Sequence, residues 1–325
     1  MRPLPFVLAL LLAAPATAEE MPCPAPGRPI EKTIRKGVPE AAVAVPTTAG
    51  LTPARTLPAG LAGSIRRVEL PAGEKLVALT FDLCETANEV AGYDGAIVDE
   101  LRRRKIPATF FVGGHWAATH PRRFAELAGD PLFEVGNHTW THADLRNRDD
   151  ADLDRQVLAP EAAFRAALDA APSCEGRPPV EARRSTLFRF PFGTCDARSM
   201  AAVNAAGMAA IQWDVSTGDP SPLASARDIV EDTLRHLRPG SIVLAHANGR
   251  GWHTGEALPR LLDELAKRGY RTLTVSDLIA RGRPVVADTC YDAHPGDVDR
   301  RGPRAAPRPP LPAPARPAAA PAPSP

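Results

Sequence analysis

The sequence predicts a barrel-like α/β fold, and three observations point to it. From Lys75 onward, seven short apolar runs alternate with amphipathic helical segments, an order typical of parallel strands joined by crossover helices. Neither of the glycine-rich loops that bind nucleotides follows any of these runs, which favours a barrel over a doubly wound sheet. The chain has 325 residues, 44% of them hydrophobic and 24% charged, which suits one large globular domain or two small ones.

Each predicted strand is a short apolar run bounded by polar or turn-forming residues. An earlier segment, residues 64–70, also alternates like a short strand, although the chain around it is rich in Pro, Ala and Gly. The residues predicted to form the strands of the barrel are 76–81, 108–112, 133–135, 187–190, 209–213, 241–245 and 272–275.

The predicted helices between these strands have clear apolar faces. Four leucines between residues 258 and 265 follow the i, i+3, i+4, i+7 spacing of a helix with one buried side. The longest predicted helix covers residues 152–170, and Pro160 near its middle predicts a kink or a break. The proline-rich stretch at 172–185 is typical of a surface excursion.

The first residues predict export. Arg2 precedes an apolar run at residues 6–14, and Ala16 and Ala18 give the small-x-small pattern of a signal-peptide cleavage site. We expect cleavage near Ala18 and a periplasmic or secreted protein. A membrane anchor is the alternative, but this run is too short to cross about 30 Å of hydrocarbon, so we expect no membrane span.

The chain therefore divides into four predicted parts. They are a signal peptide at 1–18, a Pro/Ala-rich N-terminal extension at 19–73, a barrel at 74–285 and a Pro/Ala/Arg-rich, disordered tail at 286–325. The formal net charge of +1 includes the arginines of the tail, so the body is mildly acidic and a nucleic-acid partner is not expected. The basic tail is expected to contact an anionic envelope, which deletion of residues 296–325 and a measurement of envelope retention would test.

Five cysteines allow at most two disulfides within the chain. An exported protein can keep such bonds. We predict one disulfide between Cys23 and Cys290, which would tie the ends of the folded body together. A second is predicted between Cys84 and Cys195, because both lie in segments that follow predicted strands.

Polar side chains cluster directly after the predicted strands, where barrels of this type carry their chemistry. Each could instead have a purely structural explanation. The aspartate could be a helix cap, the two histidines four apart could meet at the surface by coincidence, the arginine could belong to a rigid loop, and the last histidine could be structural. The candidates are Asp82 and Glu85 after the first strand, His138 and His142 after the third, Arg189, Phe192 and Gly193 after the fourth, Trp213 and Asp219 after the fifth, and Leu244 and His246 at the sixth. The remaining histidines are left without a function, although His253 could line the same cleft.

Taken in order, these segments resemble the polysaccharide deacetylases of carbohydrate esterase family four, the NodB-homology family, over residues 74–283. The family's motifs are T-F-D-D-G, H-[ST]-x-x-H, R-x-P-[FY]-G, D-x-x-D-W and L-x-H, and four of the five are recognisable. The resemblance implies a deformed (β/α) barrel with seven strands. It also implies hydrolysis of acetyl groups from N-acetylglucosamine polymers, or less often from O-acetylated sugars, with one divalent metal ion.

The resemblance assigns a role to each matching residue. His138 and His142 would bind the metal ion, which polarises the amide carbonyl and activates a water. Asp82 would be the general base, oriented by Arg189. The remaining assignments are His246 as the acid that protonates the leaving amine, Asp219 as the carboxylate that raises its pKa, the backbone N–H near Phe192 as an oxyanion donor, and Phe192, Gly193, Leu244 and Trp213 as residues that border the substrate.

The sequence departs from the family at its metal site. The second aspartate of T-F-D-D-G, a metal ligand in the family, is Leu83, and the glycine is Cys84. Three outcomes are open: Glu85 or Asp82 supplies an oxygen, Cys84 supplies a thiolate, or the site binds metal weakly or not at all. We favour Glu85. The ion is expected to be zinc, although cobalt and nickel suit two imidazoles and a carboxylate similarly.

The fourth motif also departs from the family, because Ser216 replaces its first aspartate and Pro220 its tryptophan. The function predicted from the sequence is a metal-dependent deacetylase acting on an acetylated polysaccharide such as peptidoglycan or chitooligosaccharide. Two alternatives stay open. One is an O-acetyl esterase with the same residues, and the other is a degenerate barrel that binds glycan without hydrolysis, for which Leu83 is the discriminating feature.

Overall fold

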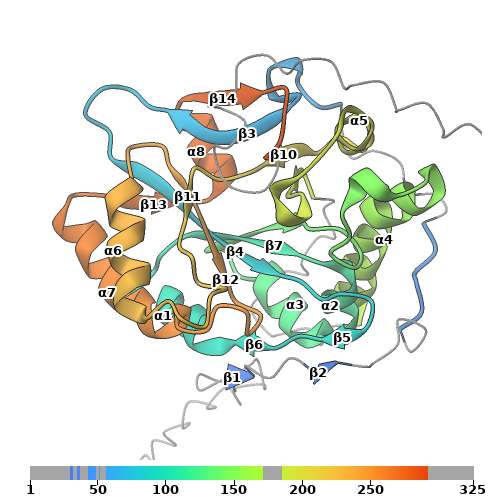
Figure 1. The fold of residues 1–325 in the computed structure, drawn as a ribbon, viewed down its shortest axis with the longest axis horizontal. Helices are drawn as coiled ribbons and strands as arrows, with labels where there is room; N and C mark the ends of the chain where they lie inside the picture. Colours follow the sequence, from blue (N-terminus) through green and yellow to red (C-terminus); the bar gives the residue numbers. More distant parts are fainter. Residues whose placement is uncertain are drawn as a thin grey trace, which may run out of the picture.

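The computed structural model describes residues 30–31, 35–36, 43–48, 51, 56–170 and 185–291 (Figure 1). The predicted signal peptide, the tail beyond residue 291, Cys23 and the stretch at 171–184 lie outside these residues. Within them, no helix is both long and apolar enough to cross a membrane.

One large sheet holds all seven predicted strands, so the strand prediction is confirmed. The order of hydrogen-bonded neighbours among the described residues is β11-β12-β4-β7-β8-β9-β10-β3-β14, with β13 pairing to β4. The strands from β11 to β3 run parallel. Their bounds are β3 Ser64–Glu69, β4 Leu76–Leu83, β7 Ala108–Val112, β8 Phe133–Asn137, β9 Leu187–Phe188, β10 Ala209–Ile211, β11 Val215–Ser216, β12 Ile242–His246, β13 Arg271–Leu273 and β14 Arg283–Ala287.

The sheet curls until its two ends approach each other, which makes a deformed barrel. An isolated antiparallel bridge joins Arg67 of β3 to Ser241 at the start of β12. Gly240 permits this approach, because a Cβ there would lie 1.7 Å from the backbone oxygen of Val68. The predicted fold class is confirmed, and β3, β11 and β14 extend the sheet beyond the seven predicted strands (Figure 1).

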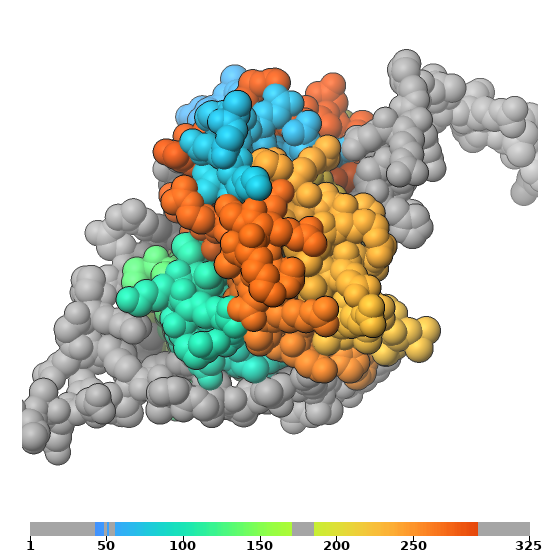
Figure 2. Space-filling model, turned by 90° about the vertical axis from the view of Figure 1, so that its left-hand side faces the viewer, coloured from blue at the N-terminus to red at the C-terminus, as the bar shows by residue number. Residues whose placement is uncertain are grey.

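Helices cover the outer face of the sheet. The leucines predicted to form the buried face of α7 are 2–4% exposed, and α7 packs between α1 and α6 on the face shown in Figure 2. Helix α4 continues through Pro160, so the predicted break does not occur. The helices are α1 Gly95–Arg104, α2 Gly114–Thr119, α3 Pro121–Ala128, α4 Asp150–Asp169, α5 Ala197–Ala205, α6 Ala226–His236, α7 Thr254–Lys267 and α8 Val275–Arg281, with 3₁₀ turns η2 Ala59–Leu61, η3 Leu145–Asn147 and η4 Pro191–Gly193.

Two short strands of the N-terminal extension pair with the loop that follows β4. Strand β1 (Ile30–Glu31) is antiparallel to β6 (Tyr93–Asp94), and β2 (Arg35–Lys36) is antiparallel to β5 (Glu89–Val90). The extension therefore runs along the segment that leaves the end of β4.

Both predicted disulfides are contradicted, because Cys195 pairs with Cys290. The chain returns beside η4 after β14, where the N–H of Tyr291 donates to the carbonyl of Gly193 over 2.9 Å. This return brings residue 290 to the loop that carries Cys195. Cys84 lies at the end of β4 as a buried, free cysteine.

Candidate active site

A buried ion pair lies at the carboxyl end of β4. Nη1 of Arg189, just after β9, is 2.8 Å from Oδ1 of Asp82 and also donates to the hydroxyl of Thr80 over 2.8 Å. Arg189 is fully buried, and its guanidinium lies over the rings of Phe111 and Trp213. Burial lowers the pKa of Arg189, but the facing carboxylate favours its charged form. Arg189 therefore holds one carboxylate oxygen of Asp82 in a fixed direction.

His138, which follows β8, presents a bare ring nitrogen to the same place. Its Nδ1 lies 2.8 Å from the carbonyl oxygen of Arg189, and a carbonyl can only accept, so Nδ1 carries the proton. Nε2 is buried without a hydrogen-bond partner, 3.4 Å from Oδ2 of Asp82. Burial lowers the pKa of His138, which favours the neutral ring. A neutral imidazole with a buried, unpartnered lone pair suits a metal ligand.

His142 converges on His138 through an irregular loop, although two histidines four residues apart would also share one side of a helical turn. The backbone is left-handed at Thr139 (φ 66°) and His142 (φ 53°). Gln156 of α4 accepts from the N–H of Thr141 over 3.0 Å and helps to fix this loop. The ring centroids of the two histidines are 5.0 Å apart. Burial, with the neighbouring His138 next, holds the pKa of His142 well below its ordinary value.

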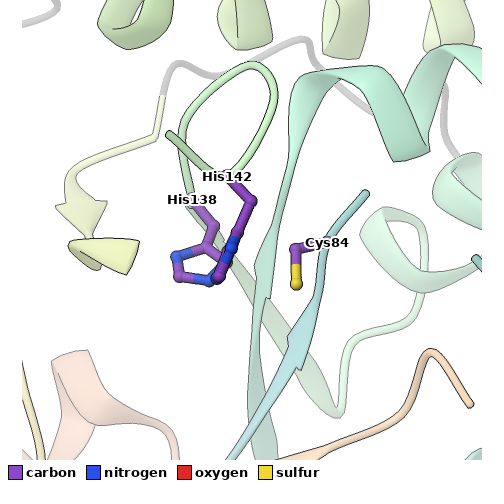
Figure 3. Close-up of side chains that lie close together, drawn as sticks. All are labelled: Cys84, His138 and His142. Atoms are coloured by element: carbon purple, nitrogen blue, oxygen red, sulfur yellow. The ribbon is translucent and has the colours of Figure 1, made fainter. Parts of the chain in front are cut away.

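The thiol of Cys84 completes a three-residue group with these imidazoles (Figure 3). The potential ligand atoms of Cys84, His138 and His142 all lie within 4.8 Å of one another. The side-chain amide of Asn248 contacts Cys84 twice, with Nδ2 2.7 Å from its carbonyl oxygen and 3.4 Å from its sulfur. Burial raises the pKa of the Cys84 thiol to about 12.

Glu85, which we favoured as the third metal ligand, does not join this group. One carboxylate oxygen accepts from the N–H of Ala91 over 2.8 Å. The other accepts from the hydroxyl of Thr119 over 2.9 Å and lies 2.7 Å from Nδ1 of His115. Extended chain places alternate side chains on opposite sides, so Glu85 lies with α2 while Cys84 shares its side with Asp82. The Glu85 carboxylate anchors the loop after β4 to α2.

His246 and Asp219 form a second pair at the same edge of the sheet. Oδ1 of Asp219 lies 2.9 Å from Nδ1 of His246, and Oδ2 accepts from the N–H of His246 and the hydroxyl of Thr254 over 2.7 and 2.6 Å. Burial alone would lower the pKa of His246, but the Asp219 carboxylate outweighs it and the pKa is raised. His246 of β12 is paired in register with Asp82 of β4, so the two groups occupy neighbouring strand ends.

The predicted substrate-bordering residues meet beside the histidines. Phe192 has a left-handed backbone (φ 59°), is 58% exposed and packs edge-on against the ring of His142. Gly193 (φ 72°) has no room for a side chain, because a Cβ would lie 2.8 Å from the indole of Trp213. Trp213 and Leu244 belong to one apolar cluster. The sequence did not suggest Tyr291, which packs against Trp213 and donates its hydroxyl to the Trp213 carbonyl.

The segment between β12 and α7 also belongs to the site, although most of its residues were not among the candidates from the sequence. A Cβ at Gly251 would lie 2.5 Å from the carbonyl oxygen of His246 and 2.7 Å from Oδ2 of Asp219, so this glycine rests directly on the pair. The N–H of Trp252 donates to the carbonyl of Asp219 over 3.2 Å, and Trp252 is 44% exposed. His253, the residue that was considered for this cleft, lies near Glu256. Gly249 and Gly251, which flank Arg250, were the sequence signal that the backbone passes close to other groups here.

The comparisons with known proteins cover the same part of the chain. The model of the polysaccharide deacetylase family matches residues 69–211. The chain is 34% identical over 211 residues to a chitooligosaccharide deacetylase of Sinorhizobium fredii, covering 61% of this chain and 89% of the relative. It is 29% identical over 214 residues to a peptidoglycan-N-acetylglucosamine deacetylase of Bacillus cereus, covering 65% and 91%.

The solved structures agree on the fold. A carbohydrate esterase family 4 pseudoenzyme from Bacillus anthracis superposes with a TM-score of 0.56 at 24% identity, covering 67% of this chain and 69% of that one. The barrel, its strand-end residues and these similarities have one explanation: the chain belongs to the polysaccharide deacetylase family, carbohydrate esterase family 4.

Proposed function

We propose that this protein is an exported, metal-dependent deacetylase that hydrolyses N-acetyl groups of amino-sugar polymers such as peptidoglycan or chitooligosaccharide. The observation that carries the proposal is the placement of Asp82 and His246 on paired positions of β4 and β12. One is held by Arg189 and the other by Asp219, and the unpartnered nitrogen of His138 lies beside them. The chitooligosaccharide and peptidoglycan deacetylases among the relatives support this substrate class.

The residues present suit a bound divalent ion, with His138 and His142 as two of its ligands. Such an ion would polarise the acetyl carbonyl and lower the pKa of a water. We propose zinc, which neutral imidazoles bind well, with cobalt as the nearest substitute.

Proton transfer falls to the two carboxylate-linked pairs. Arg189 occupies Oδ1 of Asp82, which leaves Oδ2 to accept the proton of the attacking water. His246, whose pKa Asp219 raises, then donates a proton to the amine that leaves. The backbone N–H of Phe192 stabilises the oxyanion, a contribution of about 3 kcal/mol in other hydrolases. Trp213 and Leu244 enclose the acetyl methyl group.

A glycan-binding barrel without hydrolysis is a second candidate, and one observation favours it. Leu83 stands where the resemblance places a carboxylate ligand, and its side chain is fully buried in the core. An O-acetyl esterase would use every residue named above and differ only in its substrate.

Acetate release separates these functions. We expect release from N-acetylated chitooligosaccharide or peptidoglycan, none from acetylated xylan, and loss of release in His138→Ala. Release from acetylated xylan alone would identify an O-acetyl esterase. Glycan binding without release from any of the three would identify a binding protein and overturn the deacetylase.

Export is proposed from residues 1–18, and the disulfide between Cys195 and Cys290 supports it because disulfides persist in oxidising compartments. N-terminal sequencing of protein from the cell envelope or medium tests this. We expect a mature chain that begins directly after Ala18. A chain that retains residues 1–18 in the cytoplasm would contradict export.

A further inference from the structure

The acidic residues nearest the two histidines do not supply a third ligand of the metal site. Both carboxylate oxygens of Glu85 are engaged with the loop after β4 and with α2. Oδ1 of Asp82 is engaged by Arg189, and Asp82 does not belong to the group of mutually close ligand atoms. Leu83 lies in the core. A site of two neutral imidazoles therefore lacks an anionic donor from these residues.

We propose that Cys84 is the third protein ligand, that it binds as a thiolate, and that the site takes zinc or another divalent ion with affinity for sulfur. The proposal rests on the metal dependence of the proposed function. Its geometry is the cluster shown in Figure 3: the sulfur of Cys84 and one nitrogen of each imidazole lie within 4.8 Å of one another. Catalytic zinc sites use three protein ligands drawn from histidine, cysteine and carboxylate side chains and keep a fourth position open, and one cysteine with two histidines fits this pattern.

His138 gives independent evidence that this place is built for a cation. Its side chain is 1% exposed, and Nε2 has no hydrogen-bond partner. Because Nδ1 donates to the carbonyl of Arg189, the lone pair of Nε2 points away from that contact and is available to a ligand. A buried nitrogen left in this state is costly unless something binds it. A divalent ion held together with Cys84 would satisfy it.

The surroundings of Cys84 hold its sulfur in place. Nδ2 of Asn248 points its hydrogens at both the sulfur and the carbonyl of Cys84, which fixes the direction of the side chain. Burial and the nearby carboxylates of Asp82 and Glu89 disfavour an anionic sulfur, and Arg250, which pairs with Glu89, offsets them only in part, so the bound ion itself must stabilise the thiolate. A coordinating thiol loses its proton to the bound ion, so the buried thiol and the bound thiolate are two states of one site.

A Cys84 thiolate in place of the family's carboxylate ligand keeps the negative charge of the metal site but replaces an oxygen donor with sulfur. A carboxylate and a thiolate each contribute one negative charge, so Cys84 restores the charge that Leu83 does not provide. Sulfur is softer than oxygen, and thiolate ligands shift selectivity toward zinc and away from magnesium, calcium and manganese. With a thiolate ligand, the site is therefore expected to bind a smaller range of divalent ions than two histidines and a carboxylate would bind.

Cobalt substitution of the full-length protein tests the ligand directly. A thiolate bound to Co²⁺ gives a charge-transfer absorption in the near ultraviolet, which nitrogen and oxygen ligands do not give. We expect this band in the wild type and its loss in Cys84→Ser. Cys84→Asp should retain one ion per chain without the band. Glu85→Gln should retain both the ion and the band, because Glu85 is outside the cluster.

Zinc affinity gives the second readout. Cys84→Ala should weaken zinc binding about 100-fold or more, since loss of outer contacts alone costs 10- to 100-fold. Circular dichroism of each variant checks that the fold is kept. Unchanged zinc affinity in Cys84→Ala, or a cobalt band that persists in Cys84→Ser, would overturn the assignment. Loss of metal in Glu85→Gln while the Cys84 variants keep their metal would also overturn it.

The two proposals fail in different ways. Metal bound through Cys84 without acetate release from any substrate would leave the ligand assignment standing and overturn the deacetylase. Acetate release by the wild type, with zinc affinity unchanged in Cys84→Ala, would leave the deacetylase standing and overturn the ligand assignment. A wild type that binds no zinc or cobalt at all would overturn both.

Discussion

Consecutive side chains at the end of β4 have different surroundings, and their roles differ accordingly. Asp82 pairs with Arg189, Leu83 packs in the core, Cys84 faces the histidines and Glu85 bonds to α2. The sequence identified the chemical types at this strand end but assigned the third ligand to Glu85. The alternation of an extended chain, which places Cys84 on the side of Asp82, was the signal that would have corrected it.

Asp82→Asn tests the general base. The amide keeps the shape of the side chain but cannot accept a proton, so we expect kcat to fall about 10²- to 10⁴-fold. Metal content, measured by mass spectrometry, should stay at the wild-type level because Asp82 lies outside the ligand group. Loss of the metal in this variant would instead make Asp82 a ligand.

Asp219→Asn tests the acid through its pH dependence. His246 must be protonated to act, and its raised pKa places the alkaline limb of kcat/KM above the ordinary histidine value of about 6.5. Without the carboxylate, burial dominates and the pKa falls. The alkaline limb should therefore move to lower pH by about one unit or more. An alkaline limb that stays in place would exclude His246 as the acid.

At the level of elements, the apolar runs predicted the strands well because a buried parallel strand needs a continuous apolar sequence. Strand β14 was missed because its residues, Arg283–Ala287, owe their conformation to pairing with β3, far away in the sequence. Helix α4 continues through Pro160, and α2 packs closely against it there: a Cβ on Gly114 would lie 2.7 Å from the Cα of Pro160. Local rules cannot foresee such tertiary contacts.

Gly251→Ala tests the segment that rests on His246 and Asp219. The added methyl group would overlap the His246 carbonyl and the Asp219 carboxylate, so the segment must shift. We expect kcat/KM to fall at least about 10-fold while zinc content is unchanged, since a misplacement of about 1 Å can cost 10²-fold. Gly60→Ala is the matched control, because nothing lies within 4 Å of a Cβ there. Equal activity of the two variants would contradict this role.

On the scale of the molecule, the disulfide between Cys195 and Cys290 connects the last described strand to the site. It lies beside Tyr291, which packs on Trp213 and bonds to its carbonyl. The cysteine count limited the number of possible disulfides, but the predicted pairing was wrong. The pairing depends on where the chain runs after β14, which the sequence pattern did not indicate. The pocket that we propose for the acetyl group therefore contacts a residue beyond the predicted barrel, which ends at 285.

Cys290→Ser should both destabilise the fold and weaken substrate binding in the pocket that contains Trp213. The cysteines are 95 residues apart, and loss of a native disulfide costs about 2–5 kcal/mol. We expect a lower urea midpoint and a raised KM for acetylated oligosaccharide. The reduced wild type should match the variant. An unchanged midpoint, measured under oxidising conditions, would contradict the prediction.

The pairing of β3 also bears on the order in which the chain can fold during synthesis. β3 is the first strand of the sheet to leave the ribosome, yet its partners are β10 and β14, and β14 ends at Ala287. The barrel cannot close until nearly the whole described chain has emerged. Closing such distant contacts is slow, and unpaired strand edges are prone to aggregation. A nascent chain that is still being synthesised must therefore keep β3 from pairing with other chains until β14 arrives.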